Sequence, residues 1–195
     1  MNIADAIKSV ELFDLLALLF LIVMFVLGYV QGTIRRLLGI ASILFSFLLA
    51  SQLRAPVGGF LAKNWTQFVP DYSYFIAYLV VFVVASVAFT LVLQGFYKHT
   101  PLFERYRFVD EAIGAVLGLI QAALVIGCVV VIFDSFYRQQ GIAPDSDELK
   151  FLRDFFNFYD PSGTASVFRT SLIPAFLVVF GFMIPQAIQD FFPRR

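Results

Sequence analysis

Hydrophobic residues in this chain gather in long uncharged runs instead of alternating with polar residues at short intervals. Four runs contain no Asp, Glu, Lys, Arg or His, and they have 20, 17, 26 and 22 residues: 15–34, 37–53, 72–97 and 112–133. At a rise of about 1.5 Å per residue, helices of these lengths approach or exceed the roughly 30 Å hydrocarbon core of a bilayer. The pattern predicts four transmembrane helices, at about 12–31, 37–53, 74–97 and 111–133.

Residues 1–136 are therefore predicted to form a four-helix transmembrane domain, followed by a tail over residues 137–195. In the tail, Leu152, Phe156 and Tyr159 recur at helical spacing opposite charged residues. This spacing is typical of an amphipathic helix that lies flat at a membrane surface, and we expect it at about 147–159.

Residues 170–189 are also uncharged, but their strongly apolar part, 172–184, is only 13 residues long. Pro174 is the third residue of this part of the run, and Pro185 directly follows it. A stretch of that length favours an interfacial or re-entrant element, and a fifth spanning helix is the alternative.

The composition supports a lipid environment for most of the chain. Hydrophobic residues make up 60% of the sequence, charged residues 14%, and the mean hydropathy is +0.84. A soluble domain needs polar faces to cover its core, and this chain has too few polar residues for that purpose. We predict an all-α integral membrane protein with four transmembrane helices and a C-terminal amphipathic or re-entrant tail. A formal charge of zero with dispersed cations predicts no nucleic-acid partner.

The distribution of Lys and Arg predicts the orientation of the four-helix domain. The connections 31–36 and 98–109 carry five cations in 18 residues, whereas the N-terminal flank and the connection 54–71 carry three in a longer stretch. Cytoplasmic connections are enriched in Lys and Arg. We therefore expect the N-terminus to lie on the outer side of the membrane.

Small residues recur at four-residue spacing in two of the predicted helices. Gly28 and Gly32 end the first helix, and Gly114, Gly118 and Ala122 form a stripe on the fourth. Helices in lipid associate closely where small residues let their backbones touch. The stripes predict a packing face within one chain, and the alternatives are a homo-oligomer seam or a contact with a membrane protein partner.

Asp110 stands at the head of the fourth predicted helix and has two interpretations. As an N-cap, its carboxylate would accept hydrogen bonds from the first-turn amides, with Glu111 adding favourable charge there. Alternatively, Asp110 could pair with Arg35 at the same membrane face and clasp the two glycine-bearing helix ends together.

These residues resemble the motifs of the colicin V production protein (CvpA) family of bacterial inner-membrane proteins. The first motif, an aspartate near the start of helix one and a Gly-x-x-Arg eighteen residues on, is matched by Asp14, Gly32 and Arg35. The second is matched by Asp110, Gly114 and Gly118. Gln121 and Ala122 stand where Arg and Gly are usual, and "FDSF" at 133–136 and "SLIP" at 171–174 also resemble the family.

The resemblance implies a four-helix inner-membrane protein that supports production or export of a peptide toxin and the integrity of the envelope, without a catalytic reaction. The residues agree with a non-enzymatic function, since His99 lies in a connection and Cys128 is a lone cysteine inside a helix. No nucleotide, zinc-protease or nucleophile-elbow motif occurs, so we expect no cofactor, no metal site and no catalytic residues. The alternative function is a small oligomeric channel or transporter subunit.

Overall fold

We describe residues 11–96, 107–138 and 148–181 in a computed structural model of the chain. This part of the chain contains helices and no strand. The elements are α2 (Leu12–Gln31), α3 (Thr33–Asn64), α4 (Pro70–Phe96), α5 (Arg107–Tyr137), α6 (Lys150–Tyr159), α7 (Gly163–Val167), the π-helical turn η1 (Phe168–Leu172) and α8 (Ile173–Phe180). The all-helical class is as predicted.

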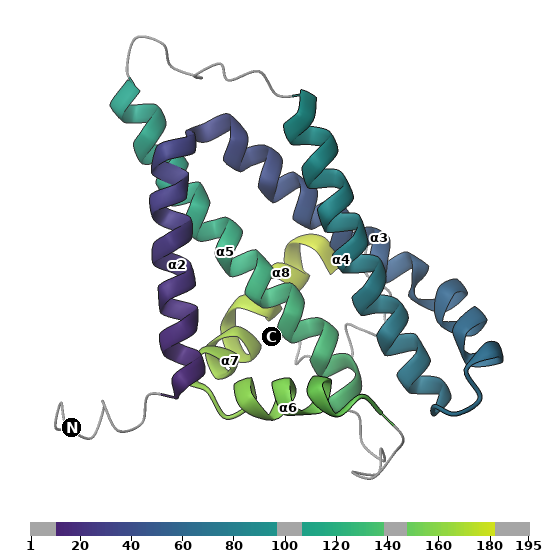
Figure 1. Cartoon of the computed structure of the whole chain (residues 1–195). Helices are drawn as coiled ribbons and strands as arrows, with labels where there is room; N and C mark the ends of the chain where they lie inside the picture. Colours follow the sequence, from purple (N-terminus) through teal and green to yellow (C-terminus); the bar gives the residue numbers. More distant parts are fainter. Residues whose placement is uncertain (1–10, 97–106, 139–147, 182–195) are drawn as a thin grey trace, which may run out of the picture.

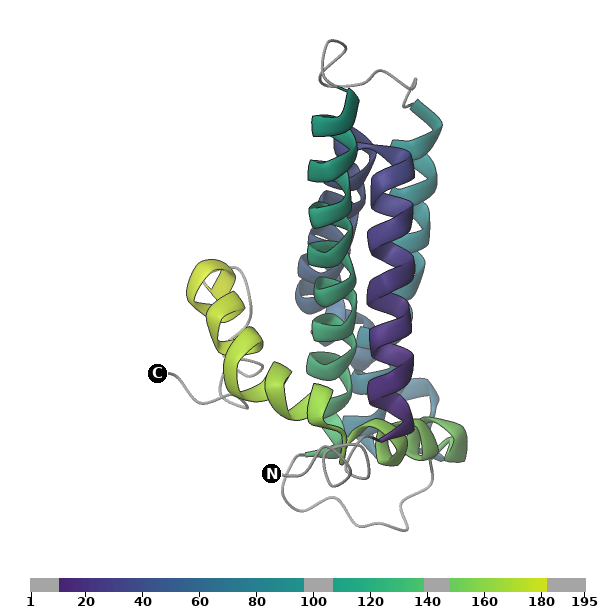
Figure 2. The ribbon, with the colours of Figure 1, turned by 90° about the vertical axis from the view of Figure 1, so that its left-hand side faces the viewer.

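The four long helices form an elongated bundle, with α2 packed on α5 and α3 packed on α4 (Figures 1 and 2). α5 also packs on α3 and so joins the two pairs. The chain turns from α2 into α3 at Gly32, which has a φ of 76°. Only glycine adopts this backbone conformation without strain, so one residue suffices to connect two helices here.

Five of the described helical segments are long and apolar enough to cross a membrane. Three contain the spans predicted at 12–31, 37–53 and 111–133, and Pro70–Leu93 overlaps the span predicted at 74–97, whose last residue lies outside the described part. The fifth is the continuous run Gly163–Phe180, built from α7, η1 and α8. This run begins before the interfacial or re-entrant segment predicted at 170–189, whose residues 182–189 lie outside the described part. In Figure 2 it leaves the end of the bundle beside α6, and its described part stops well short of the opposite end.

The helix that holds the predicted span 37–53 is longer than that span, because α3 continues to Asn64. The prediction that residues 54–71 form a connection is therefore wrong for residues 54–64, which belong to α3. Pro56 lies inside α3, where its missing N–H removes one helical hydrogen bond. Gly58 lets α3 approach α4 closely, since a Cβ there would lie 2.8 Å from the Cα of Tyr74.

Aromatic rings fill the centre of the bundle near the α6 end. Phe75 of α4 is fully buried and stacks on Phe136 of α5 with ring centroids 5.2 Å apart. α6 lies across this end of the bundle, as Figure 1 shows. Tyr137 stacks on Phe156 of α6 at 4.8 Å, and the hydroxyl of Tyr72 accepts a hydrogen bond from the backbone N–H of Leu149. α6 lies within the stretch 147–159 predicted to be a surface helix and is held to the bundle by aromatic contacts, and its place at a membrane surface stays a prediction.

Candidate functional site

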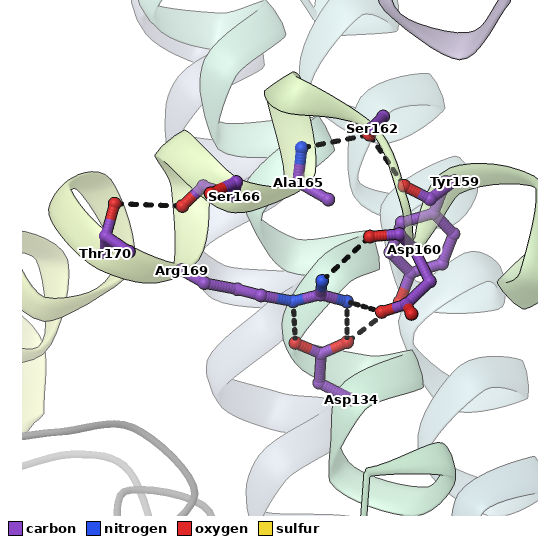
Figure 3. Close-up of polar contacts among 8 residues, drawn as sticks. All are labelled: Asp134, Tyr159, Asp160, Ser162, Ala165, Ser166, Arg169 and Thr170. Atoms are coloured by element: carbon purple, nitrogen blue, oxygen red, sulfur yellow. Dashed lines mark hydrogen bonds and ion pairs between the residues drawn. The ribbon is translucent and has the colours of Figure 1, made fainter. Parts of the chain in front are cut away.

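A cluster of four charged residues and one tyrosine joins the tail to the bundle at the α6 end. We call Asp14, Asp134, Tyr159, Asp160 and Arg169 the tail clip. Asp134 ends the apolar part of α5, and its side chain is 2% exposed. The guanidinium of Arg169 in η1 donates from Nε to Oδ2 and from Nη2 to Oδ1 of Asp134, each at 2.7 Å (Figure 3). Two parallel charge-assisted hydrogen bonds of this kind fix both distance and angle.

Asp160 completes the surroundings of the same guanidinium. Its carbonyl oxygen accepts from Nη1 of Arg169 at 3.2 Å, and its carboxylate lies 2.8 Å from Nη2. The ring of Tyr159 lies under the guanidinium, 5.6 Å from centroid to Cζ. Arg169 therefore binds α5 and the turn between α6 and α7 at once.

Tyr159 donates its hydroxyl hydrogen to Oδ1 of Asp134 at 3.0 Å. Burial raises the pKa of the Tyr159 phenol, and the neighbouring Asp134 carboxylate raises that pKa further. The phenol consequently remains a hydrogen-bond donor over the physiological pH range.

Asp14 connects the tail to α2 in a different way. Its Oδ1 accepts from the backbone N–H of Thr164 at 2.7 Å, and its Oδ2 accepts from the N–H of Gly163 at 3.2 Å. These are first-turn amides of α7, which have no partner inside their own helix. Ser162 is the local N-cap of α7 and accepts from Ala165 at 3.1 Å. The Asp14 carboxylate of α2, about 150 residues away in the sequence, thus acts as a second cap for the first turn of α7.

The predicted glycine stripes meet each other at the opposite half of the α2–α5 pair. A Cβ on Gly114 would lie 2.5 Å from the carbonyl oxygen of Gly28 and 2.8 Å from the carbonyl carbon of Gly32. A Cβ on Gly118 would meet the backbone of Met24 and lie 3.3 Å from the Cα of Gly28. These four glycines therefore occupy an intramolecular backbone contact, and Ala122 continues their face as a fully buried residue.

Asp110 lies in the first turn of α5, because the helix begins at Arg107. The prediction that Asp110 is the N-cap is therefore wrong, although its negative charge still suits the positive helix end. Thr33 donates its hydroxyl to the Asp110 carbonyl at 3.0 Å, and a Cβ on Gly32 would lie 2.5 Å from Oδ2. Oδ1 of Asp110 is buried without a hydrogen-bond partner among the described residues. Pairing of Asp110 with Arg35 stays a prediction.

Gln121 has a partner that sequence reasoning missed. Arg36 is 4% exposed, and its Nη1 donates to Oε1 of Gln121 at 2.9 Å and lies 3.8 Å from Sδ of Met24. Gly39 provides the room, since a Cβ there would lie 2.6 Å from Nε2 of Gln121. The departure from the family motif at position 121 thus coincides with a neutral acceptor facing a buried guanidinium.

In the described part of the chain no group of three or more His, Cys, Asp and Glu residues could hold a metal ion. Cys128 is buried, and His99 lies outside the described residues. The charged groups of the tail clip and the Arg36–Gln121 pair instead bind one another and the backbone. The tail clip holds η1 and α7 against α5 and α2, and the Arg36–Gln121 pair holds α3 against α5.

Comparison with known proteins agrees with the resemblance noted in the sequence. No curated protein and no solved structure matches the chain. A family model described as "Colicin V production protein" matches residues 13–154, which include α2 without its first residue, α3 to α5 and the first half of α6. The predicted family is confirmed: the chain belongs to the colicin V production protein family.

Proposed function

We propose that this chain is a non-enzymatic inner-membrane protein that supports toxin production or export and envelope maintenance by helix packing. The family points to a membrane protein involved in toxin production. The tail clip is the observation that carries the finer proposal. Asp14 and Asp134 bind α7 and η1 to the end of the bundle, so α6, α7 and η1 form a folded surface there.

This surface offers exposed apolar side chains for contact with a membrane protein partner. Phe151 on α6 is 64% exposed, and Val167 at the end of α7 is 55% exposed. The glycine face, in contrast, is used between α2 and α5 of one chain. We therefore place the partner contact on the tail and assign the glycines to internal packing.

Photo-crosslinking in native membranes tests this proposal. A photoreactive amino acid at Phe151 should attach a distinct membrane protein, and Arg169→Ala should abolish the adduct because the clip no longer holds the tail. The same amino acid at Val84, a 62% exposed position on α4, is the matched control and should give only lipid adducts. Equal protein adducts at both positions would overturn the proposal.

The charge clasp at the other end is tested by exchange. If Arg35 and Asp110 pair, Arg35→Asp and Asp110→Arg should each lower the stability of the folded protein. The double variant should recover that stability. Failure of the double variant to recover would remove the clasp without affecting the proposed tail contact.

The proposed orientation, with the N-terminus outside, rests on the five cations of the connections 31–36 and 98–109 against three in the N-terminal flank and residues 54–71. The tail brings Arg138, Lys150, Arg153 and Arg169 to the N-terminal end, so a count over the whole chain no longer separates the two ends. Reporter fusions after Val69 and after Tyr106 decide the matter. An inward signal after Val69 would reverse the orientation.

Ion or solute flux in liposomes that contain only this protein distinguishes the proposed function from a channel or transporter. The proposal predicts no flux above that of empty liposomes. Reproducible flux that scales with the amount of protein would replace the proposal with transport.

A further inference from the structure

A partly enclosed apolar cavity of about 260 Å³ lies between α3, α5 and the arm formed by η1 and α8. Its inner wall includes Phe47, Cys128, Val131 and Ile173, each at most 3% exposed. Its rim includes Ile120 and Leu172, which are 46% and 44% exposed. The cavity therefore opens at the lipid-facing side of the bundle and ends against its core.

The side chains that line the cavity offer water almost no hydrogen-bond partners. These side chains are apolar, and the thiol of Cys128 is their most polar group. A buried water needs two to four hydrogen-bond partners, so an apolar cavity of this kind stays dry. The occupant must be an apolar molecule or segment.

The position of the cavity identifies the most abundant apolar molecule that can reach it. The lining residues of α5 run from Ile120 to Val131, within the uncharged stretch 112–133. At about 1.5 Å per residue this part of α5 covers roughly 16 Å, from the middle of the membrane almost to Asp134. This is the depth range occupied by the acyl chains of one leaflet.

We propose that this cavity binds one acyl chain of a phospholipid from the leaflet at the Asp134 end. The ester end of the chain lies toward the tail clip, and the methyl end lies toward Ile120. Arg169 is already bound by Asp134 and Asp160, so the guanidinium is not available for a phosphate. The site recognises the chain and is indifferent to the charge of the headgroup.

Gly127 keeps the cavity open between α5 and η1. A Cβ on Gly127 would lie 3.6 Å from the ring of Phe168, an ordinary contact, so a larger side chain fits without forcing the helices apart. A leucine at position 127 would extend into the cavity and displace part of the bound chain. The displaced methylenes would exchange their contacts with the cavity lining for contacts with lipid or detergent, so binding would weaken through lost van der Waals packing.

Native mass spectrometry of the purified full-length protein tests the proposal. After detergent exchange and addition of palmitoyl-oleoyl phosphatidylethanolamine or phosphatidylglycerol, the wild type should retain one phospholipid of either kind, and Gly127→Leu should lose it. Gly95→Leu is the matched control, because a Cβ on Gly95 meets no atom within 4 Å. Leu172→Trp at the exposed rim is a second variant that narrows the opening without entering the core, and it should also reduce retention.

Three outcomes overturn the proposal. Absence of retained lipid in the wild type would mean that the chain itself or a partner fills the cavity. Equal retention in Gly127→Leu, Leu172→Trp and Gly95→Leu would place the lipid elsewhere on the protein. Retention of phosphatidylglycerol alone would indicate a headgroup site instead of an acyl-chain site.

Discussion

Asp134 of α5 and Arg169 of η1 form a two-point ion pair, with both N–O distances at 2.7 Å and with side chains only 2% and 11% exposed. The pair joins two segments that are 35 residues apart in the sequence. Each charge has lost most of its contact with solvent, so each depends on the other for compensation.

Removing one partner of this pair should destabilise the tail strongly. Arg169→Leu leaves the Asp134 charge buried and unpaired, a change that costs about 3–5 kcal/mol in comparable cases. The double variant Asp134→Asn/Arg169→Leu should recover part of the loss because no buried charge remains. Thermal unfolding in detergent and limited proteolysis near Pro161 measure both effects.

Arg153→Ala is the control for this prediction. Arg153 pairs with Glu148, whose side chain is 5% exposed, but Arg153 itself is 28% exposed against 11% for Arg169, so its loss should cost less than the loss of Arg169. If Arg153→Ala and Arg169→Leu lowered the melting temperature equally, the tail clip would have no special role.

Asp14 should act on the first turn of α7. Asp14→Ala removes the acceptor for two backbone N–H groups, which by analogy with N-cap losses costs about 0.5–2 kcal/mol. Hydrogen exchange of Gly163 and Thr164 should accelerate in this variant, whereas in Asp14→Asn, which keeps one acceptor oxygen, only one of the two amides should accelerate. Asp154→Ala, at an exposed position of α6, should leave these two amides unchanged.

Gly114 should not tolerate even one methyl group. Gly114→Ala places a Cβ against the Gly28 backbone and should cost about 1–3 kcal/mol, as overpacking does elsewhere. Gly95→Ala meets open space and should be neutral or slightly stabilising, because alanine favours a helix more than glycine. Melting temperatures in one detergent compare the two directly, and a similar shift for both would show that α2 and α5 can separate at little cost.

The protein should tolerate an exchange of Arg36 and Gln121, but it should not tolerate arginine at both positions. Gln121→Arg places a second guanidinium beside Arg36 in a buried position and should destabilise the protein by several kcal/mol. The double variant Arg36→Gln/Gln121→Arg restores one donor and one acceptor and should recover most of the loss. A double variant as unstable as the single one would show that the position of the charge on α3 matters by itself.

The uncharged runs were sufficient to locate the four long helices, because a bilayer penalises charge over a fixed length. The same criterion placed the end of the second span at Leu53, whereas α3 continues past Arg54, since a charged residue can sit in a helix that extends beyond the apolar stretch. The four-residue spacing of glycines was also informative, as it reflects the geometry of one helix face.

The tail clip could not be found by spacing. Asp14 lies about 150 residues from its amide partners, and Asp134 belongs to the short motif "FDSF" at 133–136. Arg169 directly precedes the uncharged run at 170–189. A lone arginine beside an apolar segment indicates a buried ion pair, because such a charge needs a carboxylate partner. Asp134 is a buried carboxylate at the end of a helix.

The α2–α5 pair is thus fastened at both extremities: its glycines interlock near Gly32, and Asp14 and Asp134 grasp one tail at the other end. Sliding of α2 along α5 would break the glycine contact or the hydrogen bonds to the tail. α3 is bound to the same pair, so a movement of α3 relative to α5 would also break the hydrogen bonds from Thr33 to Asp110 and from Arg36 to Gln121.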